Sequence, residues 1–232
     1  MLAKVKSFLL AKYWEYRHLL YPGWADKYLE NIGGPVNNYI ADKVLALSPM
    51  TVFEFGSSSG PNLITLYNKR KNLHALGLDI SATAVAAGRS YAVKHGIDVI
   101  TFRTGDVRSL SELGTNSFDV AFSSAVLIYL DEASVKSAVE ALLRIAKKGV
   151  IIVEQDSLAG ESVFDGRKWL HDYKKIFSEA AGVFEVKSEK IPGSVWGGDW
   201  GKCGYVYTLI KPLPDIAAHN SAMDVSIPPS QG

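Results

Sequence analysis

Short apolar runs alternate with longer amphipathic segments through the middle of this chain. The first run, Thr51–Phe55, is β-branched and aromatic and ends at a glycine, which predicts a buried strand. Four later runs of the same character predict further strands at His74–Leu78, Val99–Arg103, Phe118–Ser123 and Val150–Glu154. Continuous apolar strands of this kind are typical of a sheet that is covered on both faces.

Helical segments separate these strands. The pattern predicts helices at Asn62–Lys69 with Pro61 in its first turn, at Ala82–His95 with Ser81 as its N-cap, and at Glu132–Ala146, closed by Lys147, Lys148 and Gly149. Strand and helix therefore alternate from Thr51 to Glu154. This alternation predicts a Rossmann-like three-layer α/β sandwich with a mostly parallel sheet and helices on both faces.

The last part of the chain predicts the edge of the same sheet. A helix is expected at Lys168–Ala180, followed by strands at Val183–Ile191 and Gly204–Lys211. The Gly- and Trp-rich segment Pro192–Gly201 joins these two strands, so we expect an antiparallel C-terminal hairpin that brings the sheet to seven strands. Residues 212–232 hold four of the nine prolines and show little periodicity, which predicts a disordered tail.

Residues 1–50 precede the first strand and predict a helical cap. Helices are expected at Lys4–Tyr21 and Val36–Leu47, and the loop between them is rich in aromatic residues. This cap is either a lid over a pocket or a layer packed on the sheet. Lysines beside apolar residues also permit a helix at a membrane surface, although packing on the domain is the better interpretation. We expect the α/β domain to span 51–211 and the tail 212–232.

Composition narrows the class of protein. The chain has 232 residues, 47% of them hydrophobic, which is enough for one domain with a sizeable core. Its 25 Lys and Arg balance 24 Asp and Glu, which argues against a dedicated nucleic-acid binder. Cys203 is the only cysteine, which favours a reducing compartment. No apolar stretch has the length of a signal peptide core or a membrane span, so we expect a cytoplasmic protein without a membrane partner.

The turn after the first strand carries candidate binding chemistry. It reads Glu54-Phe55-Gly56-Ser57-Ser58-Ser59-Gly60-Pro61-Asn62. Its glycines permit a sharp turn and a close approach of a ligand to the main chain, and the helix that follows presents unpaired N–H groups. Asp79 closes the second strand 19 residues after Gly60, where a carboxylate can accept hydrogen bonds from both ribose hydroxyls of an adenosine.

This stretch resembles motif I of the class I S-adenosylmethionine-dependent methyltransferases, which is an acidic residue, an apolar residue and Gly-x-Gly-x-Gly. Glu54, Gly56, Gly60 and Asn62 match that motif, whereas Ser58 replaces the middle glycine. The resemblance covers about residues 50–210, because further matches follow in the family's order: Asp79-Ile80 at the ribose, Gly105-Asp106-Val107 at the adenine, and Phe118–Ser123, which ends at the methionine moiety.

The resemblance implies transfer of a methyl group from S-adenosylmethionine to a nitrogen or oxygen of a small-molecule acceptor, with S-adenosylhomocysteine as the product. The cofactor-binding residues that it implies are Glu54, Gly56, Ser57, Ser58, Gly60, Asn62, Asp79, Ile80, Asp106, Val107 and Ser123. Methyl transfer chiefly requires the donor and the acceptor to be held in line, so no metal is expected. A hydroxyl acceptor would also benefit from a general base.

Residues that contact the acceptor are expected beyond the carboxyl ends of the strands, where ligands bind in open α/β sheets. The candidate catalytic residues are Tyr129 after the fourth strand, Asp156 after the fifth and His171 in the next predicted helix. A surface histidine is an equally good interpretation of His171. The candidate acceptor-binding residues are Tyr21, Trp24, Gln155, Trp196 and Trp200, whose aromatic members could wall the site or simply pack.

Two other functions stay open. A dinucleotide-dependent oxidoreductase uses a related fold, but its Gly-x-Gly-x-x-Gly differs from the four-residue spacing of Gly56 and Gly60. A non-catalytic subunit that binds S-adenosylmethionine would keep the same pocket. Methylation of DNA bases at an amino group is disfavoured, because such enzymes usually carry Asn/Asp-Pro-Pro-aromatic after the fourth strand, and this chain has Ser123-Ser124-Ala125-Val126 there. Methylation of cytosine at C5 is disfavoured as well, because it needs a cysteine nucleophile after a proline, and Cys203 follows Lys202. We expect a small-molecule acceptor as the partner, no nucleic acid, and a monomer or homodimer.

Overall fold

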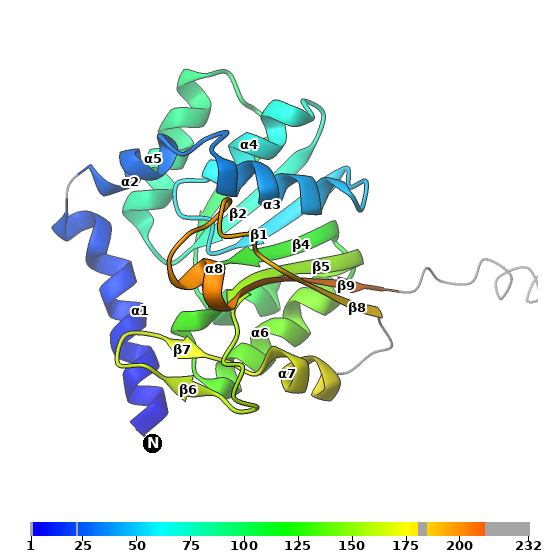
Figure 1. Cartoon of the computed structure of the whole chain (residues 1–232). Helices are drawn as coiled ribbons and strands as arrows, with labels where there is room; N and C mark the ends of the chain where they lie inside the picture. Colours follow the sequence, from blue (N-terminus) through cyan, green and yellow to red (C-terminus); the bar gives the residue numbers. More distant parts are fainter. Residues whose placement is uncertain (1, 22, 181–184, 212–232) are drawn as a thin grey trace, which may run out of the picture.

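A seven-stranded sheet forms the centre of the computed structural model, which describes residues 2–21, 23–180 and 185–211 (Figure 1). The strands are β1 (Thr51–Phe55), β2 (His74–Asp79), β3 (Ile100–Thr104), β4 (Phe118–Ser124), β5 (Ala146–Gln155), β8 (Glu185–Lys190) and β9 (Gly204–Ile210). Their order is β3-β2-β1-β4-β5-β9-β8. The first five strands are parallel, and β9 is antiparallel to both β5 and β8, which confirms the predicted fold and C-terminal hairpin.

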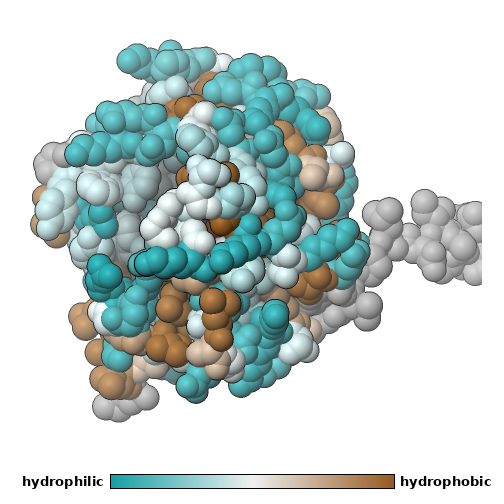
Figure 2. Space-filling view, viewed as in Figure 1, coloured by the Kyte–Doolittle hydropathy of each residue, from teal (hydrophilic) through white to brown (hydrophobic). Residues whose placement is uncertain are grey.

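Helices cover both faces of this sheet (Figure 1). The helices are α1 (Leu2–Leu20), α2 (Trp24–Leu29), α3 (Pro35–Leu45), α4 (Pro61–Lys69), α5 (Ala82–Lys94), α6 (Glu132–Ile145), α7 (Tyr173–Glu179) and α8 (Asp199–Cys203), with short 3-10 helices η1 (Val107–Glu112) and η2 (Leu127–Tyr129). In the space-filling view hydrophilic residues cover most of the upper part of the molecule, whereas hydrophobic ones gather at the lower left (Figure 2). Within the described residues, every helix is too short or too polar to cross a bilayer.

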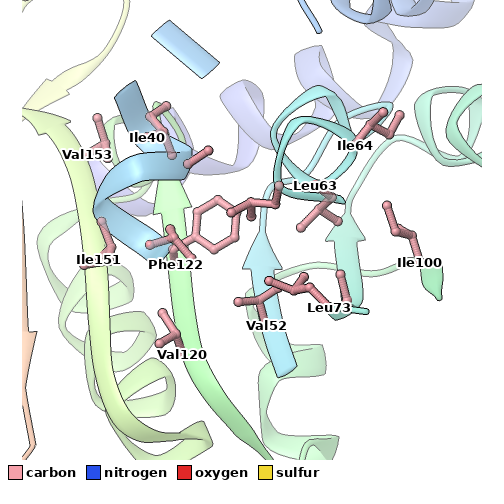
Figure 3. Close-up of a cluster of buried hydrophobic side chains, with 14 of the residues drawn as sticks. Ile40, Val52, Leu63, Ile64, Leu73, Ile100, Val120, Phe122, Ile151 and Val153 are labelled. Carbon is pink, nitrogen blue, oxygen red and sulfur yellow. The ribbon is translucent and has the colours of Figure 1, made fainter. Parts of the chain in front are cut away.

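The core consists of two apolar clusters, one on each face of the sheet. On one face Val52, Val120 and Ile151 meet Ile40 of α3 and Leu63 of α4 (Figure 3). Their sequence neighbours on β1, β4 and β5 point to the opposite face, where they pack against α6 and α7. Because both faces are buried, the strands are apolar throughout, as their sequences predict.

Helix caps fix several predicted boundaries. The Ser81 hydroxyl accepts the N–H of Ala84 at 3.3 Å, which begins α5 where the sequence predicts it. The Asp131 carboxylate accepts the N–H of Ser134 at 2.9 Å at the start of α6. The two caps therefore fix the starts of α5 and α6, which lie beside the carboxyl edge of the sheet.

The prediction of a basic last turn in the helix after β4 is wrong. Helix α6 ends at Ile145, and Lys147, Lys148 and Gly149 lie in β5. Gly149 pairs with residues on both neighbouring strands, Val120 of β4 and Ile210 of β9. Hydrogen bonding within the sheet therefore decides the conformation of this segment over its local helix-ending pattern.

Three further segments differ from the prediction. The helix expected at Lys168–Ala180 is confined to α7, because Trp169–Leu170 (β7) pairs with Val163–Phe164 (β6) in a small hairpin. Helices α2 and α8 lie in segments that were predicted as loops. The beginning of the strand expected at Val183–Ile191 and the predicted tail at 212–232 lie outside the described residues.

Candidate functional site

A cavity of about 1120 Å³ lies at the carboxyl ends of β1, β2, β3 and β4. The segments that follow these strands form its floor, namely 54–58, 79–80, 104–108 and 124–131. Residues of α1 and of the α2–α3 region, together with Trp196 and Trp200, line its remaining walls. This is the position where ligands bind in open α/β sheets.

The turn after β1 depends on its glycines. Gly56 and Gly60 have φ angles of 77° and 85°, in the left-handed region that favours glycine. A Cβ atom at Gly56 would lie 2.1 Å from Val126 Cγ2, and one at Gly60 would lie 2.3 Å from Phe102 Cε1. Ser58, which stands in place of the family's middle glycine, also has a positive φ, of 50°. The serine thus preserves the backbone path that the motif requires.

Asp79 fastens this turn to the beginning of α5. Its Oδ2 accepts the N–H of Ser58 at 2.7 Å, and its Oδ1 accepts the N–H of Ser81 at 2.8 Å. Burial raises the pKa of the carboxyl group above its usual value, and these two hydrogen bonds oppose the rise. Asp79 also lines the cavity, and its contact with a ribose stays a prediction.

Glu54 lies at the bottom of the same cavity. Its Oε1 accepts a hydrogen bond from Asn62 Nδ2 at 2.7 Å, and Asn62 Oδ1 accepts one from Asn37 Nδ2 at 2.6 Å. Glu54 Oε2 is buried and has no hydrogen-bond partner among the residues that the structure describes. Burial raises the pKa of Glu54 to about 8. A buried carboxylate oxygen without a partner favours a ligand that brings a donor or a positive charge.

Asp106 and Val107 line the cavity after β3. Arg108 Nη2 lies 2.6 Å from Asp106 Oδ2, and this hydrogen bond holds the pKa of Asp106 below its usual value. Arg108 also lines the cavity, so the two groups form an ion pair at this end of it. The adenine contact of Asp106 stays a prediction.

A second buried acid supports the segment after β4. Glu154 Oε1 accepts the N–H groups of Val126 at 2.8 Å and of Leu127 at 2.7 Å. Burial raises the pKa of Glu154 to about 8. Val126 packs against Gly56, and Tyr129 at the end of η2 lines the cavity. Glu154 therefore positions a wall of the site from behind.

Tyr129 faces the cavity in a mostly buried environment. Its ring lies 4.8 Å from the ring of Trp14 on α1. Burial raises the pKa of the Tyr129 phenol, so the group stays protonated at neutral pH. The side chain can donate a hydrogen bond or restrict an acceptor, but in this state it is a poor base.

The N-terminal helices contact the segments that form the cavity floor. His18 of α1 is buried, and its Nδ1 lies 2.9 Å from Ser81 Oγ. Burial lowers the pKa of His18, and within the described part of the chain its Nε2 has no hydrogen-bond partner. The Ser59 hydroxyl donates to the backbone oxygen of Ala25 at 2.9 Å. These contacts join α1 and α2 to the segments after β1 and β2.

Sequence reasoning did not identify His18, Asn37 or Glu154. The first two lie in the N-terminal helices, and only the tertiary fold brings them to the strand ends. For Glu154 a signal existed, because it is an acid at the end of an apolar strand, as is Glu54. Such acids are rare without a local partner or a ligand.

The expected acceptor-binding residues do not all meet at the cavity. Trp196 and Trp200 line it, with their rings stacked 3.8 Å apart. Gln155 is buried beneath the site, Tyr21 is exposed at the end of α1, and the Arg17 guanidinium lies 4.0 Å above Trp24. Ser123, expected at the methionine moiety, and Gly60 also lie behind the cavity wall.

The expected location of His171 in a helix is wrong. His171 precedes α7 and forms a β-bridge with Asp156. Its Nε2 lies 3.0 Å from the backbone oxygen of Leu130, and its Nδ1 lies 3.1 Å from Ser162 Oγ. Asp156 accepts a hydrogen bond from the Tyr207 hydroxyl. Of the three candidate catalytic residues, Asp156 and His171 are thus buried in contacts outside the cavity, whereas Tyr129 lines it.

A family model described as a methyltransferase domain matches residues 47–201. Because this match spans more than half of the chain, the protein belongs to that family of methyltransferase domains. A comparison with curated proteins found no matching relative. The family confirms the resemblance that the strand-end motifs predict.

Solved structures share the fold at low sequence identity. The magnesium protoporphyrin IX methyltransferase of Synechocystis PCC 6803, solved with bound S-adenosylmethionine, is 15% identical with a TM-score of 0.62, and the match covers 89% of this chain and 97% of that one. A protein from Pyrococcus horikoshii OT3 is 15% identical with a TM-score of 0.63, covering 84% and 98%. The cyclase SpnF is 17% identical with a TM-score of 0.60, covering 76% and 81%. Identities this low establish the fold alone.

Proposed function

We propose that this protein binds S-adenosylmethionine in the cavity and transfers its methyl group to a nitrogen or oxygen of a small-molecule acceptor, leaving S-adenosylhomocysteine. The observation that carries the proposal is the meeting of the glycine turn, Glu54 and Asp79 in one cavity at the carboxyl ends of the strands. Membership of the methyltransferase-domain family supports the same reaction class.

The residues present fit this cofactor. Asp79 offers carboxylate oxygens to the ribose hydroxyls beside a glycine turn that lets a nucleoside approach the backbone. The buried Glu54 Oε2, which lacks a partner among the described residues, matches a positively charged amino group. We assign the adenine to Asp106 and Val107, and the remaining support to Gly56, Ser57, Ser58, Gly60, Asn62, Ile80 and Ser123.

The protein contributes positioning rather than bond-making groups. When bound, the cofactor supplies a methyl group on a positively charged sulfur, which is open to in-line displacement. The chain holds the acceptor in line and excludes water, and this alone removes much of the barrier. A cavity of about 1120 Å³ exceeds the roughly 300–1,000 Å³ of common ligand sites, so an acceptor fits beside the cofactor.

We assign the acceptor to the region between Tyr129 and the stacked rings of Trp196 and Trp200. Flat aromatic walls suit an apolar, sugar or amine ligand. We further propose that the N-terminal cap, residues 1–50, acts as a lid on the α/β domain at 51–211 through α1, because Trp14 and His18 of α1 line the cavity, whereas α3 packs in the core.

Ligand-dependent thermal stability tests the cofactor assignment. Excess S-adenosylhomocysteine is expected to raise the melting temperature by several degrees, since it binds only the folded state, and NAD is expected to leave it unchanged. The opposite pattern would support an oxidoreductase instead. The four-residue glycine spacing and the family match already disfavour that function.

A labelling experiment separates an enzyme from a non-catalytic binding subunit. The protein would be incubated with S-adenosylmethionine carrying a labelled methyl group and with a metabolite extract. We expect label in a small-molecule fraction and none in nucleic acid. A protein that binds S-adenosylhomocysteine yet labels nothing across varied extracts would be a binding subunit.

A further inference from the structure

Helix α1 exposes an unusual amount of apolar surface. Of the fourteen large hydrophobic side chains that are exposed within the described residues, nine lie between positions 2 and 21. They are Leu2, Val5, Phe8, Leu9, Tyr13, Tyr16, Leu19, Leu20 and Tyr21. The lower left of the molecule, where the N-terminal half of α1 lies beside the β6–β7 hairpin, is accordingly the hydrophobic part of the surface (Figure 2). Contiguous exposed apolar patches mark interaction sites.

Six of these side chains form a stripe along the helix. Leu2, Val5, Leu9, Tyr13, Tyr16 and Leu20 recur every three or four residues. At about 100° per residue they fall within an arc of roughly 80°, which places them on one face. Trp14 and His18 lie on the other face and line the cavity. The helix therefore has an inner face that closes the site and an outer apolar face, which we call the α1 stripe.

Positive charge borders the α1 stripe. The helix carries Lys4, Lys6, Lys12 and Arg17 against a single acid, Glu15, although the whole chain has a net charge of only +1. By the same helical geometry Lys6 and Arg17 flank the stripe on one side, where they lie over the rings of Phe164 and Trp24. Lys12 flanks it on the other side, where it pairs with Glu15.

The β6–β7 hairpin extends this surface. Lys6 Nζ lies 4.2 Å above the ring of Phe164 on β6, which places the hairpin against α1. Leu158 and Val163 at this hairpin are exposed as well. The hairpin therefore lies beside the N-terminal half of α1, on the side of Lys6.

We propose that the α1 stripe binds the surface of a lipid bilayer that contains anionic lipids. An apolar stripe on a helix with an excess of basic residues suits an interfacial helix, since the apolar side chains enter the acyl boundary and the net positive charge is attracted to anionic headgroups. Charge disfavours a second copy of this chain as the occupant, because a two-fold pairing of α1 with α1 brings like charges together. The inference does not depend on methyl transfer, and it revises the expectation that α1 has no membrane partner.

Vesicle co-sedimentation tests this proposal with the full-length protein. Vesicles of phosphatidylcholine alone are compared with vesicles that contain about 30% phosphatidylserine, a content that gives a negative surface potential. We expect at least tenfold more protein on the anionic vesicles, decreasing as salt is added. The double substitution Leu9→Glu and Leu20→Glu is expected to lower that binding at least tenfold.

The matched control is Val93→Glu on α5, which introduces the same charge at a side chain that is 83% exposed outside the stripe. It is expected to bind vesicles as the parent does, and a cooperative thermal unfolding transition by circular dichroism shows that each variant is folded. Absence of binding, equal binding to both kinds of vesicle, or an equal loss in the control would overturn the proposal. A dimer seen by light scattering that dissociates with Leu9→Glu would overturn it in favour of a second copy.

Discussion

Asp79 combines two tasks that are separable in principle. Each carboxylate oxygen already accepts one backbone N–H, from Ser58 or from Ser81, and keeps lone pairs toward the cavity. The group therefore shapes the glycine turn before any ligand arrives. A residue that preorganises a loop in this way reduces the ordering cost of binding.

Asp79→Ala is expected to weaken binding of S-adenosylhomocysteine by about 1–3 kcal/mol, because buried ribose hydroxyls lose a charged partner. Isothermal titration calorimetry measures the change. Asp98→Ala removes an exposed carboxylate before β3 and should leave the affinity unaltered. Equal affinities of the parent and Asp79→Ala would remove the ribose assignment.

Gly56→Ala tests the packing of the turn. Both Gly56 and Gly96 have positive φ angles, but only at Gly56 would a Cβ atom meet a neighbour, namely Val126. Gly56→Ala is therefore expected to lower the free energy of unfolding by about 1–3 kcal/mol more than Gly96→Ala does. Urea denaturation gives both values, and similar losses would show that the contact with Val126 is easily relieved.

At the scale of elements, the segment after β4 depends on one buried acid. Glu154 on β5 accepts the first amides of η2 and so connects the wall around Tyr129 to the sheet. This support explains why a 3-10 turn with Ala125 at a φ of 57° persists beside the cavity. These hydrogen bonds therefore attach the cavity wall to β5.

The titration of Glu154 is expected to appear in the stability of the protein. Its pKa rises from 4.5 to about 8, so the folded protein retains a proton that the unfolded chain has released. The contribution of Glu154 to the free energy of unfolding should therefore fall as pH rises from about 5 to about 8 and then level off. Glu154→Gln should reduce that slope by up to about 1.4 kcal/mol per pH unit. The raised pKa values of Glu54 and Asp79 add to the slope, and the lowered pKa values of His18 and His171 oppose it. Unchanged slopes in urea denaturation across this range would contradict a protonated Glu154.

The strands could be predicted from the sequence because burial on both faces leaves an uninterrupted apolar run. Thr51–Phe55 begins and ends where the pattern predicts. Lys147 and Gly149 were mispredicted because pairing with β4 and β9, which is remote in sequence, outweighs the local signal. Helix α2 escaped prediction for a related reason: six residues carry too little periodicity to indicate a helix.

The strand-end positions of the acids on the cofactor side could be predicted because the strands themselves could be predicted. Glu54 and Asp79 lie at the ends of β1 and β2, Asp106 follows β3, and parallel strands end at one edge of the sheet. His18 and Asn37 reach that edge only through packing of the N-terminal helices, which no spacing in the sequence encodes. The acceptor side depends on such packing throughout, and its residues remain predictions.

At the scale of the whole molecule, the N-terminal helix contributes little to the core. His18 is the only buried residue of α1 among those described, and both apolar clusters form without this helix. Its contacts with Ser81 and Tyr129 lie at the cavity instead. This distribution favours a role in closing the site over a role in holding the fold.

Deletion of residues 1–21 is therefore expected to leave a cooperatively folded α/β domain and to abolish methyl transfer. Circular dichroism during thermal unfolding reports the fold, and release of labelled product reports turnover. Substitution of Val93 in the full chain provides an unaffected reference. Full turnover of the shortened protein would rule out the lid, and loss of folding would assign α1 a structural role.

The crystal structure of the complex with S-adenosylhomocysteine tests the central claim most directly. The account predicts the ribose hydroxyls within hydrogen-bond distance of Asp79 and the amino group of the ligand near Glu54 Oε2. A nucleoside bound away from the carboxyl ends of β1 and β2, or crystals without ligand at saturating concentration, would contradict it.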